Sequence, residues 1–183
     1  MMLRLSCSAI LTAILMAPAA ATTLVPADLG ELARDARAIV RGRVVAVDAR
    51  WADDHRSIET LVTVDVERYL KGAWGGTVQF RVPGGELGRY RSIFVGAPEF
   101  AVDDRVVLFL GTHGPGVPHL LGLSQGVFRM ARAADNSGWV VTPPPLFPAT
   151  ATATPVVRGD VSRRPLALAD FEDRVRALAG GAQ

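Results

Sequence analysis

Cysteine is nearly absent from this 183-residue chain, which has Cys7 as its single cysteine. Cys7 lies inside an apolar N-terminal run, so the chain that follows has no thiol for a nucleophile, a thiolate metal site or a disulfide framework. A domain without such cross-links depends on its apolar core. About 120 ordered residues can bury roughly two-thirds of their unfolded surface, which is enough for an independent domain.

An excess of one charge is also lacking. The chain has 20 Lys and Arg residues against 18 Asp and Glu residues, and one of the basic residues lies in the N-terminal segment. The rest of the chain is therefore close to neutral and has no basic footprint for nucleic acid or an anionic membrane. We expect no nucleic-acid partner.

Long apolar runs are scarce as well. The longest, from Leu5 to Ala17, is shorter than the roughly 20 residues that a membrane span needs, so we expect no membrane span. Arg4 precedes this run and Pro18-Ala19-Ala20-Ala21 follows it, which is the order of a secretory signal peptide. We predict cleavage after Ala21, with cleavage after Ala19 as the alternative. The localisation expected is periplasmic or secreted.

Short apolar runs separated by turn-forming residues make up most of the remaining chain. Five consecutive apolar residues, Val106 to Leu110, lie between Asp103-Asp104-Arg105 and Gly111, which indicates a strand buried on both faces. Residues 58–70 and 77–82 alternate apolar and polar side chains and predict strands with one wet face. Further strands are expected at 39–47, 90–95, 126–132 and 138–142.

Helical spacing of apolar residues occurs near the two ends of the chain, within 26–37 and within 166–179. The fold class predicted is therefore mainly β: a small antiparallel β-barrel of about six to seven strands with a short N-terminal helix and a C-terminal helix. A β-sandwich is the alternative. The expected organisation is a signal peptide (1–21), a β-barrel domain (22–142), a linker rich in Pro, Thr and Ala (143–165) and the C-terminal helix (166–183).

Two segments resemble netrin-like domains. The first strand of that family is similar to Asp35-Ala36-Arg37-Ala38-Ile39-Val40-Arg41-Gly42-Arg43-Val44-Val45-Ala46-Val47. The following strand and its Lys-Gly turn are similar to Thr63-Val64-Asp65-Val66-Glu67-Arg68-Tyr69-Leu70-Lys71-Gly72. The likeness spans roughly residues 35 to 111 and implies an OB-fold-like barrel. The family includes the tissue inhibitors of metalloproteinases, which block a catalytic zinc with an amino-terminal cysteine. This chain has no such cysteine, so the resemblance implies the fold and not that mechanism.

The three histidines are the candidate metal ligands. His55 follows Asp53 and Asp54, while His113 and His119 flank a Gly-Pro-Gly sequence. Imidazole and carboxylate groups suit zinc or manganese, so a metal-dependent hydrolase using His55, His113 and His119 is one alternative function. The polarity of loops explains the same residues equally well. Ser124 lacks the first glycine of a Gly-x-Ser-x-Gly elbow, and we expect no serine hydrolase.

Two tryptophans in or beside turns carry the main functional hypothesis. Exposed aromatic side chains near arginine are typical anchors of binding surfaces, although each tryptophan could instead fill a barrel end. We interpret the chain as an exported, non-enzymatic binding module without a cofactor, whose partner is a protein, with a secreted protease as one candidate. An envelope structural module is a further alternative. The predicted binding residues are Trp51, Asp53, Asp54, Trp74, Glu86 and Arg89, in the loops 51–55, 72–76 and 83–88.

Overall fold

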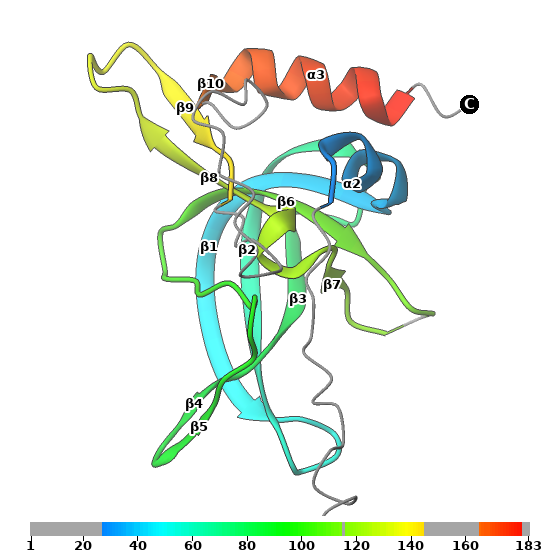
Figure 1. The fold of residues 1–183 in the computed structure, drawn as a ribbon, viewed down its shortest axis with the longest axis vertical. Helices are drawn as coiled ribbons and strands as arrows, with labels where there is room; N and C mark the ends of the chain where they lie inside the picture. Colours follow the sequence, from blue (N-terminus) through cyan, green and yellow to red (C-terminus); the bar gives the residue numbers. More distant parts are fainter. Residues whose placement is uncertain (1–26, 115, 145–164, 181–183) are drawn as a thin grey trace, which may run out of the picture.

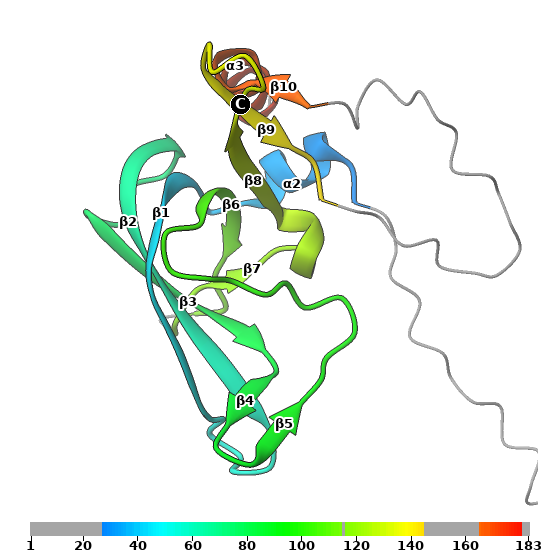
Figure 2. The same ribbon diagram turned by 90° about the vertical axis from the view of Figure 1, so that its left-hand side faces the viewer.

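The computed structural model describes residues 27–114, 116–144 and 165–180, and it is mainly β, as predicted. Eight strands form one sheet that is partly closed into a ring, and two short strands form a separate hairpin. The two predicted helices cover one end of the molecule (Figures 1 and 2). The predicted signal peptide and most of the predicted linker lie outside the described residues.

Five strands close the ring. They are β1 (Ala38–Trp51), β2 (Ile58–Lys71), β3 (Thr77–Pro83), β6 (Arg105–Gly111) and β7 (His119–Leu120). β1 pairs with β2, and β2 with β3, in antiparallel hairpins, whereas β3 meets β7 in parallel. β6 pairs with both β7 and β1, and these pairings complete the circuit. The barrel is therefore OB-fold-like, with five strands and partial closure.

The remaining elements extend this barrel. β8 (Val127–Arg132), β9 (Trp139–Thr142) and β10 (Leu166–Ala167) continue the sheet beyond β6, and the 3₁₀ helix η2 (Leu123–Gly126) precedes β8. The hairpin of β4 (Gly85–Leu87) and β5 (Tyr90–Ser92) follows β3. It lies near the β1–β2 loop, at the end of the molecule opposite the helices α2 (Leu29–Asp35) and α3 (Leu168–Gly180) (Figure 1).

The strand β6 is buried on both faces, as its apolar run predicts. Val106, Leu108 and Leu110 point into the barrel core, whereas Val107 and Phe109 belong to a second apolar cluster outside the barrel. Residues of α2, α3, β8 and β9 complete that second cluster. The alternation of strand side chains thus lets one strand form a wall of two cores.

The helix α3 packs onto the sheet. Its sequence alone does not decide whether it does so. Phe171 and Val175 are buried in the second cluster, and the Phe171 ring lies 4.9 Å from the Phe128 ring, centroid to centroid. α2 lies beside α3 and begins with a backbone N–H of Asp28 that donates to the Glu31 carboxylate at 3.2 Å. This contact satisfies one of the free donors at the helix start.

The far half of β1 differs from its predicted pattern. Simple alternation places Val47 on the face opposite Val44, but Val47 packs against the barrel core and Val45 is exposed. The pairing with β2 shifts between Val44 and Ala46, which is a β-bulge and reverses the faces beyond it. The strand also continues to Trp51 rather than ending at Val47.

Two segments after β3 also differ from expectation. Residues 83–88 are predicted to be a flexible loop but contain β4, and the strand predicted at 90–95 ends at Ser92. Gly84 and Gly85 make the bend possible, because their φ angles of 91° and 140° are open to glycine and rarely to other residues. A Cβ at Gly85 would lie 2.5 Å from the Thr60 hydroxyl, so the hairpin lies directly against β2.

Candidate functional site

The β4–β5 hairpin brings three of the predicted binding residues together at the tip of the β1–β2 hairpin. The Trp51 and Tyr90 rings meet edge to face, with 5.4 Å between their centroids. The Arg89 guanidinium lies 5.1 Å from the centre of the Tyr90 ring, and Glu86 pairs with Arg91 at 3.0 Å. Aromatic rings and arginine are therefore displayed side by side.

An apolar segment continues this surface beyond β5. Ile93 and Val95 are 76% and 82% exposed, and Phe94 is also exposed. Together with Trp51 and Tyr90 they form what we call the tip surface. Contiguous exposed apolar residues are uncommon on soluble domains unless they contact another molecule, whereas scattered ones need no explanation. The sequence pattern predicts a strand over 90–95, so these three residues are not among the predicted binding residues.

A cavity of about 620 Å³ opens beside the tip surface. Val47, Ala49, Thr60 and Val82 from the open end of the barrel line one side of it. Residues 83–86 and 91–94 of the hairpin region and residues 97–100 of the following loop line the other. Its volume falls within the range of about 300–1,000 Å³ that is usual for ligand pockets.

The other predicted binding residues are Trp74, which lies away from this group, and Asp53 and Asp54, which make contacts in or near the β1–β2 turn. Trp74 follows β2 at the end opposite to Trp51 and packs, half-buried, against the barrel core, in the alternative role considered for it. The two tryptophans therefore form no common surface. Asp53 pairs with Arg81 at 3.4 Å. Hydrogen bonds from the backbone amides of Arg56 and Ser57 lower the pKa of Asp54, whose carboxylate thus stabilises the β1–β2 turn.

Two of the three histidines meet where the loop that follows β6 joins β7: His113 lies in the loop and His119 is the first residue of β7. The Nδ1 atoms of His113 and His119 lie 3.2 Å apart, and the rings stack with an interplanar angle of 22°. Burial, and then the neighbouring His113, lower the pKa of His119. A metal ion held by both nitrogens would have to lie near both ring planes, which two stacked planes do not allow without rotation. Nor does any group of three or more His, Cys, Asp or Glu side chains in the described part of the chain form a metal site.

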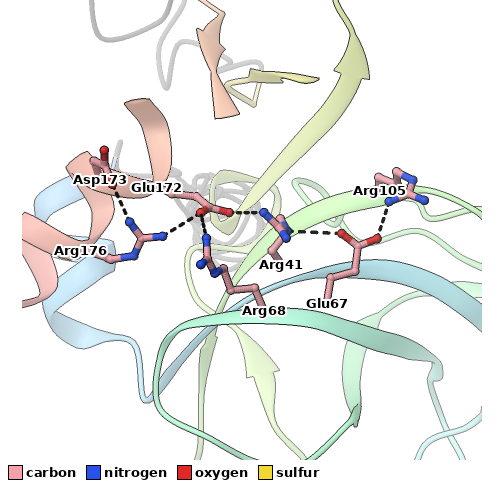
Figure 3. A network of polar contacts seen from close by, with 7 residues as sticks. All are labelled: Arg41, Glu67, Arg68, Arg105, Glu172, Asp173 and Arg176. Carbon is pink, nitrogen blue, oxygen red and sulfur yellow. Dashed lines mark hydrogen bonds and ion pairs between the residues drawn. The ribbon is translucent and has the colours of Figure 1, made fainter. Parts of the chain in front are cut away.

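A second polar constellation fixes α3 to the barrel. The Glu172 carboxylate is buried and forms ion pairs with three guanidinium groups: Arg41 at 2.5 Å, Arg176 at 2.8 Å and Arg68 at 2.9 Å (Figure 3). Arg41 also approaches Glu67, which in turn pairs with Arg105. Each of the four arginines has at least one carboxylate partner among Glu67, Glu172 and Asp173. The network explains how the helix is attached to the barrel.

Comparisons with known proteins give no relative for this arrangement: no family model matches the chain, and no curated protein or solved structure matches it significantly. Among the described helices none is long and apolar enough to cross a bilayer. The strongest candidate site that the geometry offers is therefore the tip surface with its adjoining cavity.

Proposed function

We propose that this chain is an exported, non-enzymatic binding module that captures a protein partner through the tip surface. The observation that carries the proposal is the exposure of Ile93, Phe94 and Val95, which follow Tyr90 closely in the chain, together with the exposed ring pair of Trp51 and Tyr90. Burial of aromatic anchors by a partner is the usual source of affinity in protein interfaces. The resemblance of residues 35–111 to netrin-like domains makes a secreted protease one candidate partner.

An unpaired strand edge supports the same proposal. Within the described residues β5 pairs with β4 alone, so its other edge presents backbone donors and acceptors. An extended segment of a partner can add to such an edge by main-chain hydrogen bonds while its side chains enter neighbouring pockets. The apolar residues that follow β5 and the cavity beside it suit this mode of binding.

The test is capture of a partner from the exported proteins of the source organism, with and without a chelator. The tagged chain is compared with a double variant, Ile93→Ser with Val95→Ser, and with the control Val102→Ser, an exposed valine outside the tip surface. We expect one stoichiometric partner, lost with the double variant and kept with the control, while the melting temperature of all three proteins stays nearly equal. Capture that survives the double variant would contradict the proposed surface.

The chelator separates two kinds of partner. Loss of capture in its presence would point to a metal-dependent protease, and unchanged capture to a partner that needs no metal. Because the chain lacks the amino-terminal cysteine of the tissue inhibitors, we propose that side chains of the tip surface make the contact with a protease.

A further inference from the structure

The cavity beside the tip surface has an uncompensated acidic group at its rim. Glu86 and Arg91 both line the cavity and neutralise each other at 3.0 Å. Glu99 also lines the cavity, and its carboxylate makes no hydrogen bond or ion pair with any part of the chain that the structure describes. The lining therefore carries one net negative charge.

The position of Glu99 is set by its backbone rather than by its side chain. The Glu99 carbonyl oxygen accepts a hydrogen bond from Arg129, and the Arg129 guanidinium is itself paired with Asp104 at 2.6 Å. Arg129 is thus already engaged, which leaves the Glu99 carboxylate available to a ligand. A loop anchored in this way can hold an acidic group at the rim before any ligand binds.

Part of the cavity wall is apolar and aromatic, although the Arg129 guanidinium already lies 5.7 Å from the centre of the Phe100 ring. Phe94 and Phe100 line the cavity together with Val47 and Val82, and Phe100 packs edge to face on the core residue Phe80 at 5.5 Å. An arginine side chain combines an apolar stem, which packs on such walls, with a planar guanidinium that stacks on aromatic rings and pairs with a carboxylate through two hydrogen bonds.

We infer that the cavity binds a short extended segment of the partner that contains arginine, with the guanidinium at Glu99 and neighbouring apolar side chains against the walls. This inference rests on the proposed function and names the chemistry of the partner. The cavity volume of about 620 Å³ suits several peptide residues rather than one side chain. The unpaired edge of β5, which borders the cavity, gives the segment its backbone partners.

The experiment uses the complete chain, expressed with its own N-terminal segment and purified as the cell processes it. Acetyl-Val-Arg-Val-amide is titrated into the ¹⁵N-labelled protein, and the amide shifts of cavity residues such as Thr60, Gly84 and Ser92 are followed. The comparison peptide has citrulline in place of arginine, which keeps the shape and removes the charge. Glu99→Gln is the test variant, and Asp170→Asn removes an exposed charge on α3, at the other end of the molecule.

We expect saturable shifts confined to the cavity with the arginine peptide. Affinity should fall at least fivefold with the citrulline peptide and with Glu99→Gln, and should not change with Asp170→Asn. Absence of saturable shifts, equal affinity for both peptides, or equal weakening by the two variants would overturn the inference. If the peptide fails while partner capture still depends on Ile93 and Val95, the cavity inference falls and the proposed function stands. If the peptide binds and no partner is captured, the cavity does bind an arginine-containing segment and the proposed capture of a protein partner falls.

Discussion

Glu172 is the residue whose charge most clearly holds two parts of the molecule together. It is 3% exposed and lies among the guanidinium groups of Arg41, Arg68 and Arg176, two of which come from the barrel strands β1 and β2. A carboxylate so deeply buried is tolerated because its partners neutralise it, and removing it leaves those partners without their counter-charge.

Glu172→Gln should therefore lower the free energy of unfolding by about 2 kcal/mol, since two of the three arginines remain partly solvated and lose less than fully buried groups would. Urea denaturation measures the loss. Asp173→Asn, next to it on α3 with its side chain 76% exposed, is the control and should change stability by less than about 0.5 kcal/mol. A loss below about 0.5 kcal/mol in Glu172→Gln as well would mean that the network does not stabilise the helix.

His119 should make stability depend on pH. Its pKa in the folded protein is lowered by burial and by His113, so the folded state resists a proton that the unfolded chain takes up near pH 6.5. The contribution is fully present above about pH 6.5 and is lost as the pH falls from there through the lowered pKa.

Unfolding free energies measured between pH 5 and 7.5 should show this slope in the original chain and a smaller one in His119→Gln. His113→Gln should reduce the slope in part, because it removes the weaker of the two causes. A slope that is unchanged in His119→Gln would assign the pH dependence to other groups.

At the scale of single residues the sequence predicts which side chains lie near turns better than it predicts which side chains contact one another. The sequence predicts that Trp51, Glu86 and Arg89 lie in or beside turns, and the β4–β5 hairpin does bring them to one tip. Trp74 has the same local features, yet it packs on the barrel core, since which end of β2 a turn occupies is decided by strand pairing. Glu99 carries no signal in the sequence, because its free carboxylate is visible only beside the cavity that it lines.

The inward face of a strand is predictable where a regular alternation of apolar and polar side chains determines it. The alternation in β2 and β3 gives their inward faces directly, and Val62, Val64, Val78 and Phe80 are all buried. The predicted inward face of β1 is wrong beyond Val44, because a bulge has no local signature in a run of valines and alanines. The bulged strand also passes close to β2, where a Cβ at Gly42 would lie 2.3 Å from the Asp65 carbonyl oxygen.

The helix α3 is an integral element, and a change at its buried face tests this. Phe171→Ala removes a ring that packs on Phe128 and should cost about 3 kcal/mol in unfolding free energy, through lost burial and the cavity left behind. Arg174→Ala, at an exposed position of the same helix, is the matched control and should leave the denaturation midpoint nearly unchanged. A small effect of Phe171→Ala would indicate that α3 is only an appendage.

For the whole molecule, the sequence predicts a barrel and cannot predict how the ring closes. The closing contacts are the pairing of β6 with β1 and the single parallel pairing of Arg81 with His119, and both join residues far apart in the chain. The placing of the β4–β5 hairpin and the helices at opposite ends of the molecule also depends on those contacts (Figure 2).

The shared wall formed by β6 has a consequence for how the protein melts. Since Val107 and Phe109 belong to one core while Val106, Leu108 and Leu110 belong to the other, neither core can lose this strand without exposing the second. Barrel and helices should therefore absorb heat in one peak, with equal calorimetric and van't Hoff enthalpies. Two resolved peaks would show that the cores melt separately; a single one makes the protein one thermodynamic unit despite its two apolar centres.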